Sequence, residues 1–134
     1  MSITIDHIVI PTYDHEASAQ FFAQIMGVTY AGPDRHFAPV RVSETFTISF
    51  LHAEQVAGYH LGFHIGEDDF DGILSRLQAA GVPYGNDPRD TTNLRTDHPF
   101  GGLGLFFVDL NGHLFEVMTK CEVRETCQAA AVVG

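Results

Sequence analysis

Short stretches of alternating apolar and polar residues predict strands in this chain, and two longer stretches have the spacing of amphipathic helices. In the first half, apolar side chains recur with a helical period from Asp14 to Met26, at Ala17, Phe21, Phe22, Ile25 and Met26. Asp14 is the predicted N-cap of this helix, and Gly27 its C-terminal stop. The predicted strands of this half are residues 3–10, which end before Pro11, then 37–42 and 45–51.

The second half repeats this order. Residues 27–34 read GVTYAGPD and residues 81–88 read GVPYGNDP, and an alternating segment with a histidine near its start precedes each helix. A second helix is predicted over residues 67–80, with Phe70, Ile73, Leu74 and Leu77 on one face. Two copies of one unit are therefore expected, and only the second contains a long polar loop, residues 86–102.

The last two strands place a carboxylate among apolar side chains. Residues 103–110 and 113–120 flank Asn111-Gly112, a strong hairpin signal. A two-residue turn would pair 110 with 113, 107 with 116 and 105 with 118. Glu116 would then share a face with Leu105, Phe107 and Met118, where an ionised carboxylate needs a cation or several hydrogen-bond donors.

Two histidines in strands could supply that cation by binding a metal together with Glu116. In the segment 59–65, His60, Gly62 and His64 alternate onto one face, and His7 stands in the first strand. Two imidazoles and one carboxylate with open coordination positions are a common site for Fe, Mn, Ni, Co or Zn. The alternative is structural: strand histidines are often hydrogen-bonded core residues, and Glu116 could pair with Arg95 or Arg41.

The composition and net charge of the chain exclude some classes of binding partner. The chain has 134 residues, which is enough for one ordinary domain, and a formal net charge of −10. So acidic a chain is not expected to bind nucleic acid or an anionic membrane surface. No apolar run approaches the roughly 20 residues of a membrane span, and no secretory signal is evident. Two cysteines, Cys121 and Cys127, are too few for a disulfide framework, so a cytoplasmic location is expected.

The chain resembles the vicinal oxygen chelate superfamily of glyoxalases, extradiol dioxygenases, and fosfomycin- and bleomycin-resistance proteins. The resemblance spans residues 3–120 and rests on DHIVIPTYDHEASAQFFAQIMG, YHLGFHIGEDDFDGILSRLQAAGV and LFFVDLNGHLFEVMT. It implies an α+β fold in which two tandem β-α-β-β-β modules form a half-open mixed β-barrel around a central cleft. The modules would cover about 1–55 and 56–121 of a single domain, residues 1–121, and a homodimer is expected. Residues 122–134 lack a periodic pattern and are expected to form a loose tail.

By position, the resemblance implies that His7, His60 and Glu116 bind one divalent metal ion. The glutamate that glyoxalase I carries near the end of its first module is missing here, and Ser49 stands at the matching position. The predicted function is a metal-dependent enzyme, either a lyase or isomerase or a ring-cleaving oxygenase, acting on a small substrate with vicinal oxygens. Two alternatives remain open: a non-catalytic binding or sequestration protein of the bleomycin-resistance type, and a structural or regulatory dimer.

Further side chains are candidates for the chemistry around such a metal. His64 is the candidate general base or outer-shell group, with a plain structural histidine as the alternative. Leu105, Phe107 and Met118 are candidate apolar pocket walls, with simple core packing as the alternative. Arg95 and His98 lie on the long loop and are candidates to cap the pocket, although such residues are more often solvated.

Overall fold

The structure is a computed structural model that describes residues 2–120 and divides into two compact units. Unit one contains residues up to Tyr59 together with Asp109–His113, and unit two contains His60–Val108 and the chain from Leu114 onward. The predicted tail, residues 122–134, lies outside the described residues, as do both cysteines. No helix among residues 2–120 has the length and apolar character needed to cross a membrane. The assignment of residues 1–121 to a single domain stays a prediction.

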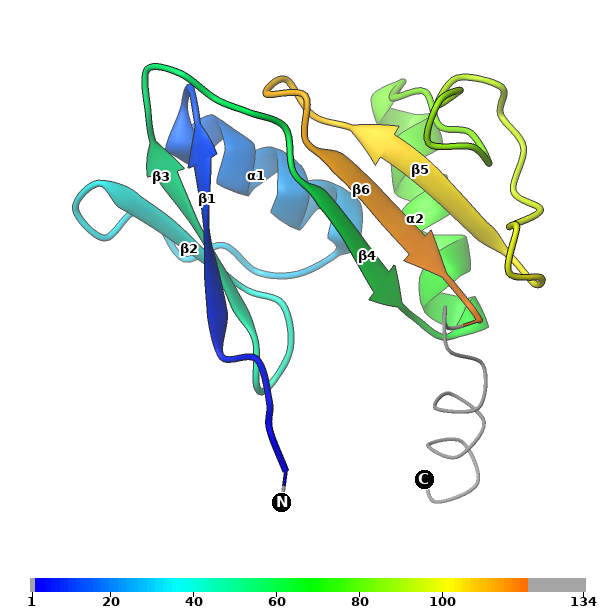
Figure 1. The fold of residues 1–134 in the computed structure, drawn as a ribbon, viewed down its shortest axis with the longest axis horizontal. Helices are drawn as coiled ribbons and strands as arrows, with labels where there is room; N and C mark the ends of the chain where they lie inside the picture. The colour runs from blue at the N-terminus through cyan, green and yellow to red at the C-terminus, as the bar shows by residue number, and fades with distance from the viewer. Residues whose placement is uncertain (1, 121–134) are drawn as a thin grey trace. The chain divides into compact units, whose positions relative to one another are not determined.

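Unit one is a three-stranded mixed sheet with one helix packed on it (Figure 1). The sheet has the order β1-β3-β2, in which β1 and β3 are parallel and β2 and β3 antiparallel. β1 continues through Pro11, further than expected, because a proline at the edge of a sheet need not donate a ladder hydrogen bond. The elements are β1 (His7–Thr12), α1 (His15–Met26), β2 (Phe37–Arg41) and β3 (Thr47–His52).

Unit two repeats this topology. Its sheet has the order β4-β6-β5, in which β4 and β6 are parallel and β5 and β6 antiparallel. The α+β class, with two mixed sheets and two helices, is therefore confirmed, and so is the repeated order of elements. The β-α-β-β-β module that the resemblance implies has three strands after its helix, whereas each unit has two among the described residues; isolated bridges, Tyr30 with Val40 and Gly85 with Phe106, follow the helices. The elements are β4 (His60–His64), α2 (Glu67–Ala80), β5 (Gly104–Val108) and β6 (Leu114–Met118).

Local signals set the ends of both helices. The Asp14 carboxylate accepts the backbone N–H of Ala17 at 3.1 Å, which confirms the N-cap of α1. Gly27 and Gly81 end the two helices with φ of 74° and 68°, a conformation that glycine adopts without strain. The buried face of α1 differs from the expected stripe, because Ala17 is exposed. Small residues let this helix pack closely, and its buried face is Ser18, Ala19, Phe22, Ala23 and Ile25.

The predicted register of the β5–β6 hairpin is wrong by one residue. Asp109 lies opposite His113, and their backbones bond at 3.1 Å, so the turn has three residues instead of two. Gly112 is the last of the three, with φ of 83°, and its N–H donates to the Asp109 carbonyl. Phe106 is therefore the partner of Glu116, and Leu105 and Phe107 lie on the other face of the sheet.

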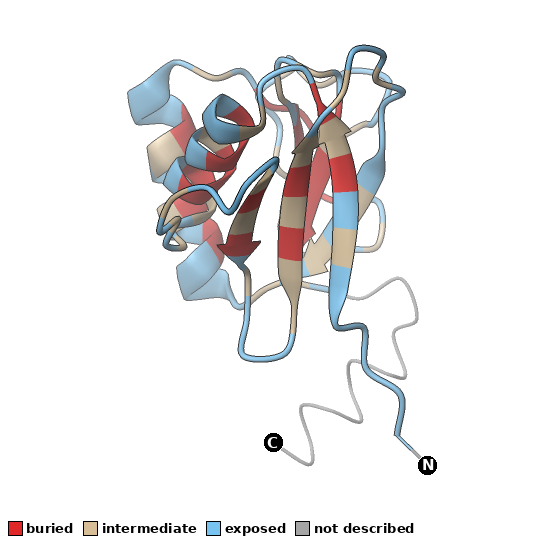
Figure 2. Ribbon diagram, turned by 90° about the vertical axis from the view of Figure 1, so that its left-hand side faces the viewer, coloured by how far each residue is buried: buried red, intermediate tan, exposed pale blue. Residues whose placement is uncertain are grey.

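The tip of this hairpin is held within unit one by His113. The ring is fully buried; its Nδ1 accepts the Tyr59 N–H at 2.9 Å, and its Nε2 donates to the Pro11 carbonyl at 2.7 Å. Nearby, the Asn111 side-chain oxygen accepts the Tyr13 N–H at 2.9 Å. His113 is thus structural. Buried residues alternate with intermediate ones along β2 and β3, whereas β5 and β6 are each buried at four of their five positions; Figure 2 colours the chain by this burial.

Removal of the α1 N-cap tests the local account of this fold. We expect Asp14→Ala to lower the free energy of unfolding by about 1 kcal/mol, because the Ala17 N–H loses its acceptor. Urea denaturation followed by circular dichroism measures the change. Asp71→Ala, which removes an exposed acid inside α2, is the matched control and should change stability by less than about 0.5 kcal/mol. Equal losses in the two variants would contradict the assignment of Asp14 as a cap.

Candidate functional site

A buried carboxylate on β6 is the centre of the candidate site. Glu116 lies on the middle strand of the unit-two sheet, between Gly62 of β4 and Phe106 of β5. Its side chain is 9% exposed, although the chain has no lysine or arginine within hydrogen-bonding range of it in residues 2–120. The predicted alternative partners, Arg41 and Arg95, instead bond elsewhere, to Thr47 and Asp97. Glu116 is therefore a buried acid whose partners are both histidines.

His60 is the first of these partners. Its Nε2 lies 2.9 Å from Glu116 Oε1, and its side chain is 50% exposed. Gly62 keeps the space beside this oxygen open, since a Cβ there would lie 3.5 Å from Oε1 and 3.1 Å from Met118 Cε. Two ligands at right angles around an ion, each about 2.1 Å from it, lie about 3.0 Å apart. The spacing of these two atoms thus fits two ligands of one metal as well as it fits a hydrogen bond.

His98 is the second partner, and sequence reasoning gave it little weight. Its Nε2 lies 2.5 Å from Glu116 Oε2, and its side chain is only 1% exposed. Its Nδ1 accepts the backbone N–H of Phe100 at 3.1 Å. A nitrogen that accepts an N–H carries no proton, so the hydrogen-bond network assigns the ring proton to Nε2, which donates it to the carboxylate.

Packing holds the His98 ring flat against the sheet. The ring stacks on Phe106 with centroids 5.6 Å apart and an interplanar angle of 16°, and it meets Phe100 edge-on at 4.7 Å. Below it lies Gly104, where a Cβ would come within 2.4 Å of His98 Cδ2, closer than real Cβ atoms approach. Two residues could have indicated this site from the sequence: Gly104, a glycine directly before the apolar residues of β5, and His98, the histidine of the preceding loop.

The third predicted ligand, His7, lies in unit one. It is exposed at the start of β1, and its Nδ1 is 2.8 Å from Asp6 Oδ2. A carboxylate bonded to Nδ1 leaves Nε2 for another partner, an arrangement common for metal-binding histidines. The structure brings His60 and Glu116 together within unit two. Among residues 2–120, no three histidine, cysteine, aspartate or glutamate side chains form a metal-binding cluster.

The strand registers make His7 and His60 equivalent. Each is the first residue of the first strand of its unit. His7 pairs with Thr47 of β3, and His60 pairs with Leu114 of β6. In unit one, Val9 pairs with Ser49, as Gly62 pairs with Glu116 in unit two. The register therefore places Ser49 where the second unit has its glutamate, which is the position that the family resemblance assigns to Ser49.

The remaining predicted site residues divide between the two faces of the sheet. His64 and Met118 share the Glu116 face; His64 is exposed and has no hydrogen-bond or ion-pair partner among residues 2–120. Leu105 and Phe107 are fully buried on the opposite face, so their assignment to a pocket around Glu116 is corrected: the one-residue register shift turns both away from it.

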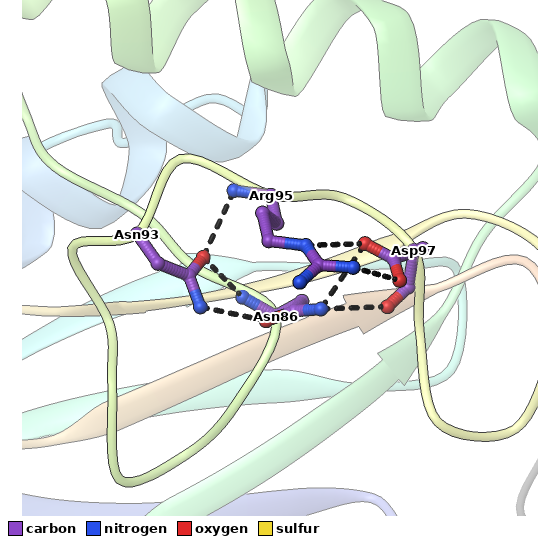
Figure 3. Close-up of polar contacts among 4 residues, drawn as sticks. All are labelled: Asn86, Asn93, Arg95 and Asp97. Carbon is purple, nitrogen blue, oxygen red and sulfur yellow. Dashed lines mark hydrogen bonds and ion pairs between the residues drawn. The ribbon is translucent and has the colours of Figure 1, made fainter.

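Arg95 belongs to a polar network that shapes the long loop (Figure 3). Its guanidinium donates to both Asp97 carboxylate oxygens, at 3.1 and 2.9 Å, and the two side chains are mostly exposed. The Asn93 side-chain oxygen accepts the N–H groups of Asn86 and Arg95, at 3.1 and 2.9 Å. Asn86 in turn donates to the Asp97 side chain at 3.1 Å. These bonds fix the segment that leads directly into His98.

Comparisons with known proteins agree with this architecture. The family model described as Glyoxalase/Bleomycin resistance protein/Dioxygenase superfamily matches residues 4–117. The structure named Oxidase ChaP-H2 is 32% identical, with a TM-score of 0.83, and the match covers 90% of this chain and 96% of that one. Oxidase ChaP-H1 is 27% identical over 91% of this chain and 99% of that one, also with a TM-score of 0.83.

A more distant structure shares the fold alone. It is a mutant of the fosfomycin resistance protein FosX from Listeria monocytogenes, complexed with Mn(II) and 1S,2S-dihydroxypropylphosphonic acid. It is 17% identical with a TM-score of 0.68, and the match covers 96% of this chain and 99% of that one. No curated protein sequence matches this chain.

The ion pair between Arg95 and Asp97 in the long loop depends on pH. The Arg95 side-chain hydrogen bond is the main cause that holds the pKa of Asp97 below its ordinary value of 3.8. Because the folded-state pKa is lowered, the ion pair stabilises the loop above pH 3.8 and is lost as the pH falls through the folded-state pKa. We expect Arg95→Gln to raise the Asp97 titration midpoint, measured from its carboxyl carbon by NMR. Arg89→Gln, which removes the partner of Asp87, should leave Asp97 unchanged; an unshifted Asp97 in Arg95→Gln would contradict the network.

Proposed function

Because this chain belongs to the Glyoxalase/Bleomycin resistance protein/Dioxygenase superfamily, we propose that it is a divalent-metal-dependent enzyme acting on a small substrate with two neighbouring oxygens. The observation that carries the proposal is the buried Glu116 carboxylate, whose partners among the described residues are the imidazole nitrogens of His60 and His98, with no lysine or arginine in reach. Burial of an ionised carboxylate is costly unless a cation compensates its charge.

The donor set fits such an ion. His60 Nε2 and Glu116 Oε1 are the proposed ligands from unit two, and both atom types bind Fe, Mn, Ni, Co and Zn. His7 is the proposed third ligand, because its ring is oriented by Asp6 and its position in unit one is equivalent to that of His60. The homodimer expected from the family resemblance would allow a second copy of the chain to supply it. Three protein ligands leave coordination positions for substrate.

A bound divalent ion would stabilise negative charge on two substrate oxygens. The chain's own residues would do the remaining work. His64 lies on the ligand face, exposed and without a partner among residues 2–120, so it is the proposed group that accepts a substrate proton. Met118 and Phe106 lie on the Glu116 face and are nearly buried, so they make the surroundings of the carboxylate apolar.

Oxidation is the reaction class that we propose first. The supporting observation is the likeness to Oxidase ChaP-H2, which extends over nearly the full length of both chains. The position equivalent to Glu116 in the first unit is Ser49, so the four-ligand set of a glyoxalase I is incomplete, and isomerisation of that kind has less support. A non-catalytic binding protein is the second candidate, favoured by the net charge of −10, which suits a cationic ligand.

Metal binding is the first test. We expect the purified protein to bind one Mn²⁺ or Fe²⁺ per proposed site, and Glu116→Gln and His60→Ala each to weaken binding by more than about 100-fold, because each removes a ligand. Isothermal titration under anaerobic conditions measures the affinity. His36→Ala, which removes an exposed histidine from the segment before β2, is the control and should bind like the wild type. Unchanged binding in both ligand variants would rule out this site.

Catalysis is the second test. We expect the Fe²⁺-loaded protein to consume oxygen with a catechol or a related substrate that has two adjacent oxygens. His64→Ala should lower the rate by about 10²-fold or more and keep the metal content, because a proton acceptor is lost while the ligands remain. An oxygen electrode and metal analysis give the two readouts. Full metal occupancy without turnover of such compounds would favour the binding protein instead.

A further inference from the structure

We infer that His98 is a positioning residue that selects which oxygen of Glu116 faces the metal. This inference rests on the proposed function. The Nε2–H of His98 holds Oε2, so that Oε1, the oxygen beside His60, is the one left to bind an ion. The carboxylate would then bind through one oxygen in a fixed orientation.

His98 is not itself a ligand, for two independent reasons. Its Nδ1 accepts the Phe100 N–H, so its Nε2 carries the proton and has no lone pair for a metal. Its Nε2 also lies 2.5 Å from Oε2, which is a short hydrogen bond and closer than the roughly 3.0 Å between adjacent ligands on one ion. The 2.9 Å spacing on the His60 side meets the ligand criterion. The two histidines therefore have different roles at the same carboxylate.

The surroundings of His98 keep it in this state. The ring is almost completely buried, stacked on Phe106 and set over the backbone of Gly104, so it has no room to rotate away from Glu116. Both backbone groups of His98 are also hydrogen-bonded: its N–H donates to the Gly102 carbonyl at 3.2 Å, and its carbonyl accepts the Gly101 N–H at 2.9 Å. A side chain fixed by packing and by its own backbone costs little further ordering when the metal binds.

A purely structural role is the competing explanation. In that case the His98 bond would only satisfy a buried carboxylate, and its loss would lower stability without a specific effect on metal binding. The positioning role predicts more: outer-shell hydrogen bonds to metal ligands are typically worth 10- to 100-fold in metal affinity. Only the positioning role predicts that loss of the His98 donor weakens metal binding and that another N–H donor at this position restores it.

The tautomer is tested first, in metal-free wild-type protein. In ¹⁵N-histidine-labelled protein, we expect long-range ¹H–¹⁵N spectra to show His98 as the Nε2–H tautomer. Its Nε2 proton should be shifted far downfield by the short bond, and Glu116→Gln should move that signal. A ring protonated on Nδ1 would overturn the inference, and this measurement does not depend on metal binding.

The coupling to metal is tested with three variants and Mn²⁺ titrations of the full chain. His98→Phe keeps an aromatic ring but removes the donor, and we expect it to weaken Mn²⁺ binding by about 10- to 100-fold. His98→Gln places an N–H the same number of bonds from the backbone, and it should restore most of that loss. Gly104→Ala forces a Cβ into the ring and should weaken binding as His98→Phe does, whereas Gly66→Ala, with open space around its Cβ, should have no effect.

The outcomes separate the two proposals. Absence of Mn²⁺ binding by the wild type overturns the proposed function, while the tautomer measurement still decides the hydrogen bond. If the wild type and His98→Phe bind Mn²⁺ with the same affinity, the positioning role is overturned and the proposed function is not. Equal weakening in His98→Phe and His98→Gln also overturns it, because the donor would then not be the cause. Thermal unfolding of each variant, followed by circular dichroism, shows whether it is folded; if His98→Phe is not, the comparison of Gly104→Ala with His98→Gln decides the test, and unchanged binding in Gly104→Ala overturns the positioning role.

Discussion

The bond between the Glu116 carboxylate and two histidines is the interaction on which the candidate site depends. The carboxylate lies on the central strand of its sheet, almost inaccessible to water, and each of its oxygens meets an imidazole nitrogen. An ionised group in such a place is costly without compensation. Its histidine partners supply hydrogen bonds, and they leave one oxygen directed toward a half-exposed ring. This combination supports the proposal that Glu116 is a ligand for a cation.

The two histidines reach the carboxylate by different structural routes. His60 belongs to the repeated part of the fold, since its counterpart in unit one is His7 at the same position of the equivalent strand. His98 comes from the loop of residues 86–102, which the first unit lacks. Unit one likewise has Ser49 in place of the glutamate. Unit two therefore contains both the carboxylate and the loop histidine that bonds to it, whereas unit one has Ser49 at the equivalent position.

The loop can present a buried histidine because its own polar groups are satisfied. Asn86, Asn93, Arg95 and Asp97 bond to one another and to the loop backbone, so the segment needs neither a helix nor a strand to keep one conformation (Figure 3). Glycines complete the arrangement. Gly85 lies so close to the Asp90 carbonyl that a Cβ would come within 2.2 Å, and Gly104 leaves room for the ring. Loops of this kind commonly carry function on a rigid scaffold.

The sequence by itself determined the class of fold, the repeated order of its elements, the caps of α1, the family, and the acid whose burial needs an explanation. These features depend on local periodicity or on motifs a few residues long, which the chain order preserves. Only the tertiary structure decided the hairpin register and the partners of Glu116. The third residue in the turn shifts the pairing of β5 with β6 by one position, so Leu105 and Phe107 lie in the core on the face opposite Glu116. His98 became visible only once a loop had folded over a glycine, because contacts between residues 18 positions apart, without a repeating pattern, leave no periodic signal in the sequence.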